Sequence, residues 1–156
     1  MGLKKKMQQQ DEITAAQKAL TEFLKSRKLR IIPKRFDILQ HIYMIGKGHF
    51  TAEELYEYLL SQNCKVSRAT VYNTIDLLLD AKLLRKSQFL ESAAVYEKTL
   101  NKKLHHHCIC NICGKIRDLR DEGVIKTAVM TRRIAKFKQR DFALCIYGVC
   151  ADCEKK

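Results

Sequence analysis

Residues 67–80 read SRATVYNTIDLLLD, and their spacing predicts a capped, amphipathic helix. Ser67 is suited to cap a helix, because its hydroxyl can accept a bond from an unpaired backbone N–H. Arg68 and Tyr72 lie four residues apart and therefore share one face near the start of this helix. The opposite face is predicted to be buried, since apolar residues recur there at helical spacing: Val71, Ile75, Leu78 and Leu79.

The residues before this helix predict three others. Residues 12–28 carry apolar side chains at helical spacing and predict one amphipathic helix. Pro33 suits the first turn of a second helix, which is expected to end near Gly46. Thr51 and Glu54 form a capping box that opens a third helix, because hydroxyl and carboxylate each bond an otherwise unpaired backbone N–H.

Two β-prone stretches follow the helix that begins at Ser67. They cover residues 83–89 and 94–97 and predict a hairpin. A winged helix-turn-helix domain has this order of elements: helices, then a capped helix, then a hairpin. In such a domain the capped helix contacts base edges and phosphates. The alternative is an ordinary core helix with a solvated polar face, since exposed Arg and Tyr are common.

Two Cys-x-x-Cys pairs bracket the C-terminal third: Cys110 with Cys113, and Cys150 with Cys153. Each pair aims two sulfurs at one point and supplies half of a tetrahedral thiolate shell, so we predict one structural Zn²⁺ site. Disulfides, a thioredoxin-like redox pair and chance spacing are the alternatives. The remaining cysteines are expected to be small buried thiols: Cys64, Cys108 and Cys145.

Composition limits the functions that are plausible. The 156-residue chain is 46% hydrophobic, which suffices for one ordinary domain or two small ones. Its net charge of +13 favours a polyanionic partner, most simply nucleic acid, although a basic surface can serve solubility alone. We find neither a signal peptide nor a membrane-length apolar run and expect a soluble cytoplasmic protein.

Three motifs in order resemble the ferric uptake regulator family. They are residues 49–56 (HFTAEELY), residues 67–74 (SRATVYNT) and residues 105–115 (HHHCICNICGK). The similarity covers roughly Leu20 to Cys153. It implies a homodimeric DNA-binding repressor of α+β class, with a winged-helix domain at 1–98, a hinge at 99–104 and an α/β dimerisation domain at 105–156. For that domain the sequence itself predicts strands at 105–111, 115–119 and 142–147 and a helix at 122–137.

A regulatory metal site is expected beside the histidine run. In a strand, His105 and His107 point to one face while His106 points to the other. Imidazoles with carboxylates suit Fe, Mn, Zn or Co. The family resemblance adds three ligands to these two histidines: His49, Glu97 and Asp118. Ligands from both domains would let metal binding lock the hinge.

The resemblance also implies residues that contact a palindromic operator in double-stranded DNA. Asn73 stands where many members carry arginine. This difference could change base preference, because asparagine favours adenine whereas arginine favours guanine. Ile32 replaces a frequent threonine ahead of the Pro33-x-Arg35 element, which predicts a lost helix cap. The candidate DNA-binding residues are Arg35, Ser67, Arg68, Thr70, Tyr72 and Asn73.

Several signals remain possible for such a regulator. Asp118 resembles the peroxide-sensing branch of the family, in which oxidation of a histidine ligand releases DNA. Iron-responsive and peroxide-responsive repression are therefore the two favoured hypotheses, and zinc or manganese sensing is less favoured. A zinc-ribbon adaptor with permanent metals is a further alternative. A metallohydrolase is not favoured, because no HExxH element or nucleophile constellation is present.

Overall fold

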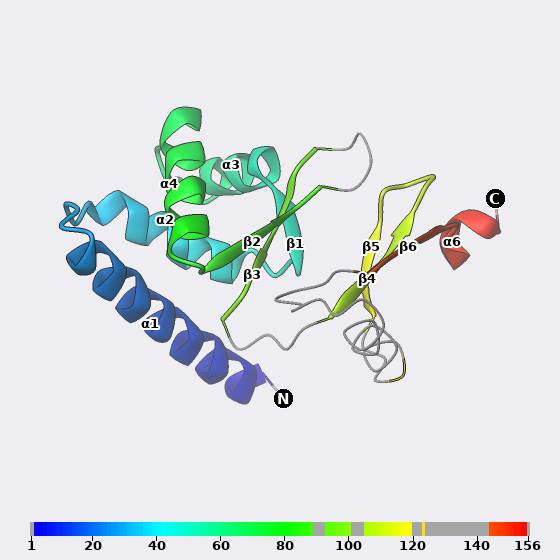
Figure 1. The fold of residues 1–156 in the computed structure, drawn as a ribbon, viewed down its shortest axis with the longest axis horizontal. Helices are drawn as coiled ribbons and strands as arrows, with labels where there is room; N and C mark the ends of the chain where they lie inside the picture. Colours follow the sequence, from blue (N-terminus) through cyan, green and yellow to red (C-terminus); the bar gives the residue numbers. More distant parts are fainter. Residues whose placement is uncertain (1, 89–92, 101–104, 120–122, 124–143, 156) are drawn as a thin grey trace, which may run out of the picture. The chain divides into compact units, whose positions relative to one another are not determined.

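The computed structural model describes residues 2–88, 93–100, 105–119, 123 and 144–155 (Figure 1). The chain divides into two compact units, Met1–Lys102 and Lys103–Lys156, called unit 1 and unit 2 below. Each unit has its own three-stranded sheet. The α+β class that the sequence predicts is confirmed.

Unit 1 begins with helices and ends with a hairpin, as a winged-helix domain does. Its strands form a sheet in the order β1-β3-β2, with both pairings antiparallel. The elements in chain order are α1 (Gly2–Ser26), α2 (Pro33–Met44), β1 (His49–Thr51), α3 (Ala52–Ser61), α4 (Arg68–Asp80), β2 (Leu84–Ser87) and β3 (Val95–Lys98).

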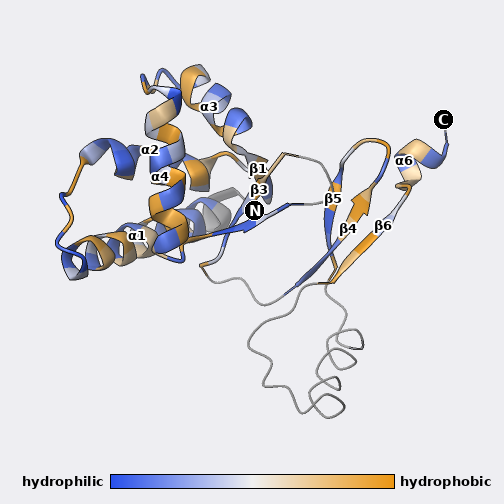
Figure 2. Ribbon diagram, turned by 45° about the horizontal axis from the view of Figure 1, so that its top comes forward, coloured by the Kyte–Doolittle hydropathy of each residue, from blue (hydrophilic) through white to orange (hydrophobic). Residues whose placement is uncertain are grey.

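One apolar core holds these elements together. Figure 2 shows the corresponding hydrophobic stripes along the helices. Ile75 and Leu78 of α4 are fully buried, as the spacing predicts, and Thr74 joins them on the buried face. Further fully buried side chains come from four helices: Ala16, Leu20 and Leu24 of α1, Ile38, Leu39 and Ile42 of α2, Leu55 and Leu59 of α3, and Val71 of α4.

The helix starts show which caps the sequence encodes. Thr51 Oγ1 accepts from Glu54 N at 3.1 Å, and Glu54 Oε2 accepts from Thr51 N at 2.8 Å, so the predicted capping box is confirmed. Ser67 Oγ accepts from Thr70 N at 3.1 Å, which confirms the predicted cap of α4. Ile32 provides no side-chain bond to α2, as its apolar side chain predicts.

Unit 2 is built on a second, smaller sheet. The order is β5-β4-β6, where β4 pairs with β5 antiparallel and with β6 parallel. Its described elements are β4 (His106–Cys110), β5 (Ile116–Leu119), β6 (Cys145–Gly148) and α6 (Ala151–Glu154). The predicted helix at 122–137 falls almost wholly outside the described residues.

Three elements differ from the sequence prediction. Helix α1 starts at Gly2 rather than near residue 12, and Gln9 Nε2 anchors the added turns by donating to Tyr43 O at 2.7 Å. Strand β1 was not predicted, because three residues are too short for a periodic signal. The short helix α6 was also not predicted.

Helix α1 is long, but it is rich in charged and amide side chains. Within the part of the chain that the structure describes, no helix has both the length and the apolar character to cross a bilayer.

Candidate metal centres and nucleic-acid interface

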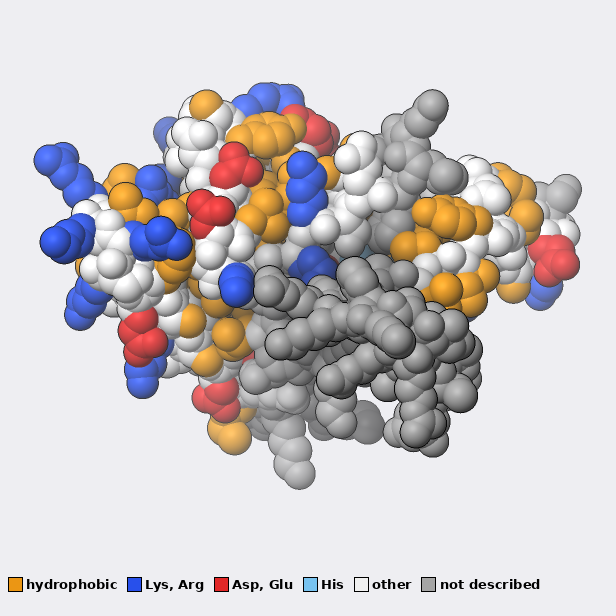
Figure 3. Space-filling view, in the orientation of Figure 1, with side chains coloured by type: hydrophobic (Ala, Val, Ile, Leu, Met, Phe, Trp, Pro, Cys, Tyr) orange, Lys and Arg blue, Asp and Glu red, His pale blue; other side chains and the backbone are white. Residues whose placement is uncertain are grey.

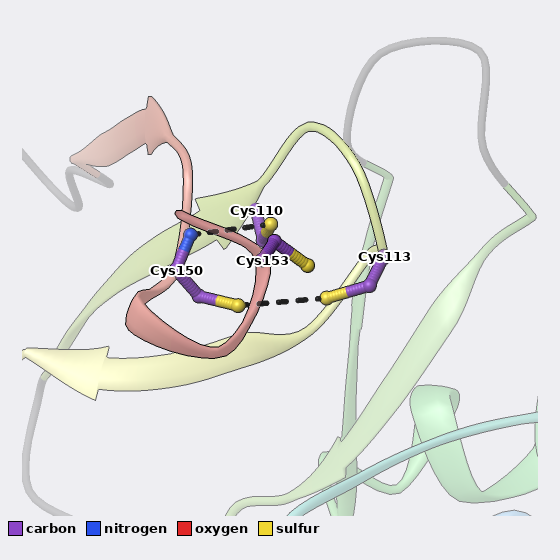
Figure 4. Close-up of side chains that lie close together, drawn as sticks. All are labelled: Cys110, Cys113, Cys150 and Cys153. Carbon is purple, nitrogen blue, oxygen red and sulfur yellow. Dashed lines mark hydrogen bonds between the residues drawn. The ribbon is translucent and has the colours of Figure 1, made fainter. Parts of the chain in front are cut away.

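The four cysteines of the two predicted pairs converge in unit 2 (Figure 4). Cys110 ends β4 and Cys113 lies in the following turn, while Cys150 precedes α6 and Cys153 lies within it. Their sulfur atoms all lie within 4.8 Å of one another, and the Sγ atoms of Cys113 and Cys150 are 3.7 Å apart. Four sulfurs at 2.3 Å from one Zn²⁺ would be about 3.8 Å apart in a tetrahedron. The donor set and its spacing therefore fit Zn²⁺.

Local backbone geometry brings each pair together. Gly114 N donates to Cys110 O at 3.0 Å and has a positive φ of 69°, a conformation that glycine adopts without strain. In the second pair, Cys153 N donates to Cys150 O at 2.9 Å. The parallel pairing of β4 with β6 then places the two turns at the same end of the sheet. A metal there would join chain segments that lie far apart in sequence.

The protonation of these thiols indicates why a cation suits the cluster. Backbone amide donors at Cys113 and then Cys150 lower the pKa of Cys110 to about 6. Hydrogen bonds with the sulfurs of Cys113 and Cys150 raise the pKa of Cys153 to about 12. One sulfur is thus favoured as a thiolate while its neighbour holds its proton, because adjacent thiolates repel one another. A bound cation would offset this repulsion.

The other three cysteines lie outside this cluster. Cys64 is buried in the core of unit 1, and Cys108 and Cys145 are half-buried on β4 and β6. Burial raises the pKa of the Cys145 thiol. The interpretation of these cysteines as small packed thiols agrees with the burial of Cys64 and is weaker for the other two.

In unit 1, strand pairing brings together a histidine and a carboxylate. His49 of β1 lies directly opposite Glu97 of β3, with His49 Nε2 3.7 Å from Glu97 Oε2. Arg85 of β2 lies opposite Glu97 on its other side, with Nη1 3.7 Å from Glu97 Oε1. The sequence did not predict strand β1, so the pairing of His49 with Glu97 became visible only in the structure. His49 and Glu97 are called the unit 1 pair below.

In unit 2, β4 and β5 bring two imidazoles and a carboxylate together. The rings of His105 and His107 are 5.0 Å apart between centroids. His105 Nε2 lies 3.7 Å from Asp118 Oδ1, and His107 is opposite Asp118 in the register. His106 makes a separate contact, because Leu144 N donates to its Nδ1 at 3.2 Å. The expected proximity of His105 and His107 is confirmed, and these two residues with Asp118 are called the unit 2 triad.

Most of the candidate DNA-binding residues gather at the start of α4. Ser67 is the N-cap residue of α4, and the other four lie in its first two turns: Arg68, Thr70, Tyr72 and Asn73. The Ser67 Oγ and Thr70 Oγ1 atoms are 2.8 Å apart, so both hydroxyls take part in the cap. Arg35 lies half-buried in the first turn of α2 and, among the described residues, makes no hydrogen bond or ion pair with this group.

The exposed face of α4 also contacts α3, which the sequence did not predict. Arg68 Nη1 forms an ion pair with Glu53 Oε2, and Arg68 Cζ lies 4.6 Å from the centroid of the Tyr56 ring. The Tyr72 hydroxyl donates to Glu53 Oε1 at 3.4 Å. One aromatic ring and one carboxylate of α3 thus contact the same guanidinium.

Surface charge does not by itself identify a nucleic-acid face. In the view of Figure 3, Lys and Arg side chains are spread over unit 1 and alternate with acidic side chains. The geometry of α4 is therefore a stronger indication than net charge.

The fold and the four-cysteine cluster together define a class of protein, namely winged-helix chains with a thiolate-rich second unit. The family model described as "Ferric uptake regulator family" matches residues 26–147. A ferric uptake regulation protein of Synechococcus elongatus is 35% identical over 133 residues, covering 85% of this chain and 90% of that protein. This chain belongs to the ferric uptake regulator family, which makes it a metal-responsive transcription regulator.

Two further comparisons extend this result. The peroxide operon regulator of Bacillus subtilis is 31% identical over 139 residues, covering 89% of this chain and 94% of that protein. The ferric uptake regulator structure from Helicobacter pylori matches with a TM-score of 0.82 at 20% identity, over 92% of this chain and 95% of that one. The second match supports the fold alone. The first is consistent with a peroxide-regulator branch as well as with an iron-regulator branch.

Proposed function

We propose that this chain is a cytoplasmic, homodimeric repressor that binds a palindromic operator when it holds Fe²⁺. It would control genes for iron uptake or for the response to peroxide, and it would have no enzymatic activity. The observation that carries the proposal is that each unit presents an incomplete set of metal ligands. These are the unit 1 pair, His49 and Glu97, and the unit 2 triad, His105, His107 and Asp118.

Each set is well formed but too small for a full coordination shell. The unit 1 pair offers one imidazole and one carboxylate, and the unit 2 triad offers two imidazoles and one carboxylate. The chain from Glu97 to His105 can span at most roughly 30 Å when extended, so the linker limits how far apart the two sets can lie. Together they would supply five nitrogen and oxygen donors, a set suited to Fe²⁺, Mn²⁺ or Zn²⁺.

Shared ligands would couple the metal to the orientation of the units. An ion that contacts both sets binds only the arrangement that brings them together, and it therefore shifts the population toward that arrangement. Reciprocal linkage then makes DNA tighten metal binding as much as metal tightens DNA binding. The proposed hinge at residues 99–104 would carry the change.

The four-cysteine cluster has a different proposed role. Four thiolates leave no open position for water or for an exchanging ligand, so Cys110, Cys113, Cys150 and Cys153 would hold a structural Zn²⁺. This ion would stabilise unit 2 and would not act as the signal.

The edge strand of unit 2 supports assembly into a homodimer. Strand β6 pairs with β4 on one side, and no other described strand pairs with it, so among the described residues β6 lies at the edge of the sheet. Its residues Ile146 and Tyr147 are 46% and 40% exposed. Exposed apolar side chains on an edge strand favour pairing with a second chain. A two-fold dimer would in turn require an operator with matching two-fold symmetry.

The proposal is tested by selecting bound sequences from a library of random duplexes under anaerobic conditions with Fe²⁺ or Mn²⁺. We expect a palindromic sequence, which is called the selected duplex below. Removal of the weaker metal with a mild chelator should reduce affinity for the selected duplex by about 5- to 150-fold, the usual range of allosteric coupling.

Substitutions identify the ligands in the same assay. His107→Ala should abolish the metal dependence while the Zn²⁺ content stays at one ion per chain. His41→Ala is the matched control, because His41 lies on α2 and contacts Asp37 O instead. Unchanged metal dependence in His107→Ala would contradict the proposed site.

Other outcomes would favour the alternatives. Tight binding that persists after mild chelation indicates a constitutive zinc-ribbon adaptor. Repression that responds to Zn²⁺ or Mn²⁺ but not to Fe²⁺ indicates a zinc- or manganese-responsive regulator of this family. Loss of DNA binding after peroxide treatment of the Fe²⁺ form, but not of the Mn²⁺ form, would assign the chain to the peroxide-sensing branch.

A further inference from the structure

Glu53 is an acidic residue on the face of unit 1 that carries the candidate DNA-reading side chains. It lies in the first turn of α3, yet its carboxylate contacts two residues of α4. Oxygen Oε2 pairs with Arg68 Nη1, and Oε1 accepts a hydrogen bond from the Tyr72 hydroxyl at 3.4 Å. One carboxylate therefore fixes two side chains that stand one helical turn apart.

Arg68 is held from a second direction as well. Its guanidinium carbon lies 4.6 Å from the centroid of the Tyr56 ring, which is also on α3. A guanidinium stacked on a ring and paired through one nitrogen keeps other N–H donors available, because arginine has five in a planar fork. The contact with Glu53 therefore orients Arg68 without using all its donors.

The magnitude of these contacts rules out a large stabilising role. The Arg68 and Glu53 side chains are 59% and 47% exposed, and ion pairs of this kind contribute little to folding. An acidic group near phosphates also opposes DNA binding of every sequence. A carboxylate in this position is better explained by an effect on which duplex is bound than by stability.

We propose that Glu53 is a positioning residue that sets sequence specificity, an inference that rests on the proposed DNA-binding function. By fixing Arg68 and Tyr72 before binding, Glu53 reduces the side-chain entropy lost when they meet base edges. By its charge, it weakens contacts that involve phosphates alone. Both effects favour the selected duplex over random DNA.

The test compares dissociation constants for the selected duplex and for a random duplex of equal length. We expect Glu53→Gln to weaken binding of the selected duplex by roughly 3- to 10-fold, since two side chains lose their fixed orientation. The same substitution should leave binding of the random duplex unchanged or tighter. The dissociation constant for the random duplex divided by that for the selected duplex should therefore fall by roughly 3- to 10-fold, or by more if random binding tightens.

Glu57→Gln is the matched control, because Glu57 is exposed one turn further along α3 and the charge change is identical. It should shift both dissociation constants together and leave their ratio unchanged. In an Arg68→Gln background, Glu53→Gln should alter the ratio much less than in the wild type. The thermal midpoint of each variant should remain close to the wild-type value.

The possible results distinguish failure of the positioning role of Glu53 from failure of the proposed DNA-binding function. If the wild type discriminates between duplexes but Glu53→Gln gives the same ratio as Glu57→Gln, the positioning role is wrong and the DNA-binding function stands. If the effect of Glu53→Gln persists in full without Arg68, the role is also wrong. If the wild type binds no duplex with any metal, the proposed function and this inference both fail.

Discussion

The two units of this chain are stabilised in different ways. Unit 1 has a continuous core of buried apolar side chains drawn from all its helices and strands. In the described part of unit 2, the buried residues are instead three consecutive histidines with Ile109 and Cys110. Apolar burial thus dominates the first unit, whereas candidate metal ligands make up most of the buried residues that are described in the second. This difference means that metal removal and core truncation should affect separate units.

The largest expected effect is the loss of unit 2 on removal of one thiolate. Cys113→Ser should abolish the folded state of unit 2, because Zn²⁺ binding to such sites contributes about 10–16 kcal/mol of apparent free energy. In NMR spectra of Cys113→Ser, the dispersed signals of unit 1 should disappear in one cooperative transition on heating. The signals of unit 2 should have the narrow dispersion of an unfolded chain before heating begins. Cys145→Ser, which changes a half-buried thiol outside the cluster, is the control. Native unit 2 signals in Cys113→Ser would remove the distinction between the units.

The converse substitution acts on the core of unit 1. Leu78→Ala removes a fully buried side chain and should lower the free energy of unfolding of unit 1 by about 2–5 kcal/mol. Denaturant unfolding followed by circular dichroism measures this change. The Zn²⁺ content should stay the same, and a parallel loss of Zn²⁺ would show that the units unfold as one.

A smaller effect is expected where α2 lacks a cap. Ile32 has the extended backbone of an N-cap residue and is 41% exposed, but its side chain makes no capping bond. Ile32→Thr should therefore stabilise unit 1 by about 0.5–1 kcal/mol. Thr51→Ala, which breaks the capping box of α3, should destabilise it by about 1 kcal/mol. Opposite signs for these two substitutions in chemical denaturation would support the assignment of both caps.

The smallest expected effect is a pH dependence confined to unit 1. Partial burial raises the pKa of Glu54, but hydrogen bonds from Lys47 and Thr51 outweigh this and lower it overall. A carboxyl with a lowered folded-state pKa contributes stability above its unfolded value of about 4.3, and this contribution is lost as the pH falls through the folded value. Glu54→Gln keeps the capping geometry and should flatten this acid dependence. A thermal midpoint that changes with pH equally in both proteins would exclude Glu54 as the source.

Sequence patterns predicted most of the fold because local rules determine it. The capping box at Thr51, the cap at Ser67 and the apolar stripe of α4 each involve residues within a few helical turns. Strand β1 was missed because three residues carry too little periodicity. The start of α1 was placed too late because its added turns are polar and gain their order from a contact with Tyr43 of α2.

Within the candidate sites, spacing identified the candidate ligands that lie close in sequence. The Cys-x-x-Cys turns and the alternation of His105 with His107 follow from backbone geometry alone. The pairing of His49 with Glu97 could not be derived in this way, and only the family resemblance implied both as ligands. The contacts of Glu53 with Arg68 and Tyr72 left no signal in the sequence, because exposed charges of α3 have no fixed partner until α4 packs beside it.

Helices α2, α3 and α4, the caps of α3 and α4, and the two Cys-x-x-Cys pairs followed from the sequence alone, because each depends on side chains a few residues apart. Only the tertiary structure decided the register of β1 on β3 and the carboxylate that Arg68 meets. Those contacts join residues separated by 15 or more positions, and their geometry depends on how whole elements pack. Packing of the apolar core fixes these positions, and the polar side chains on the surface follow from it.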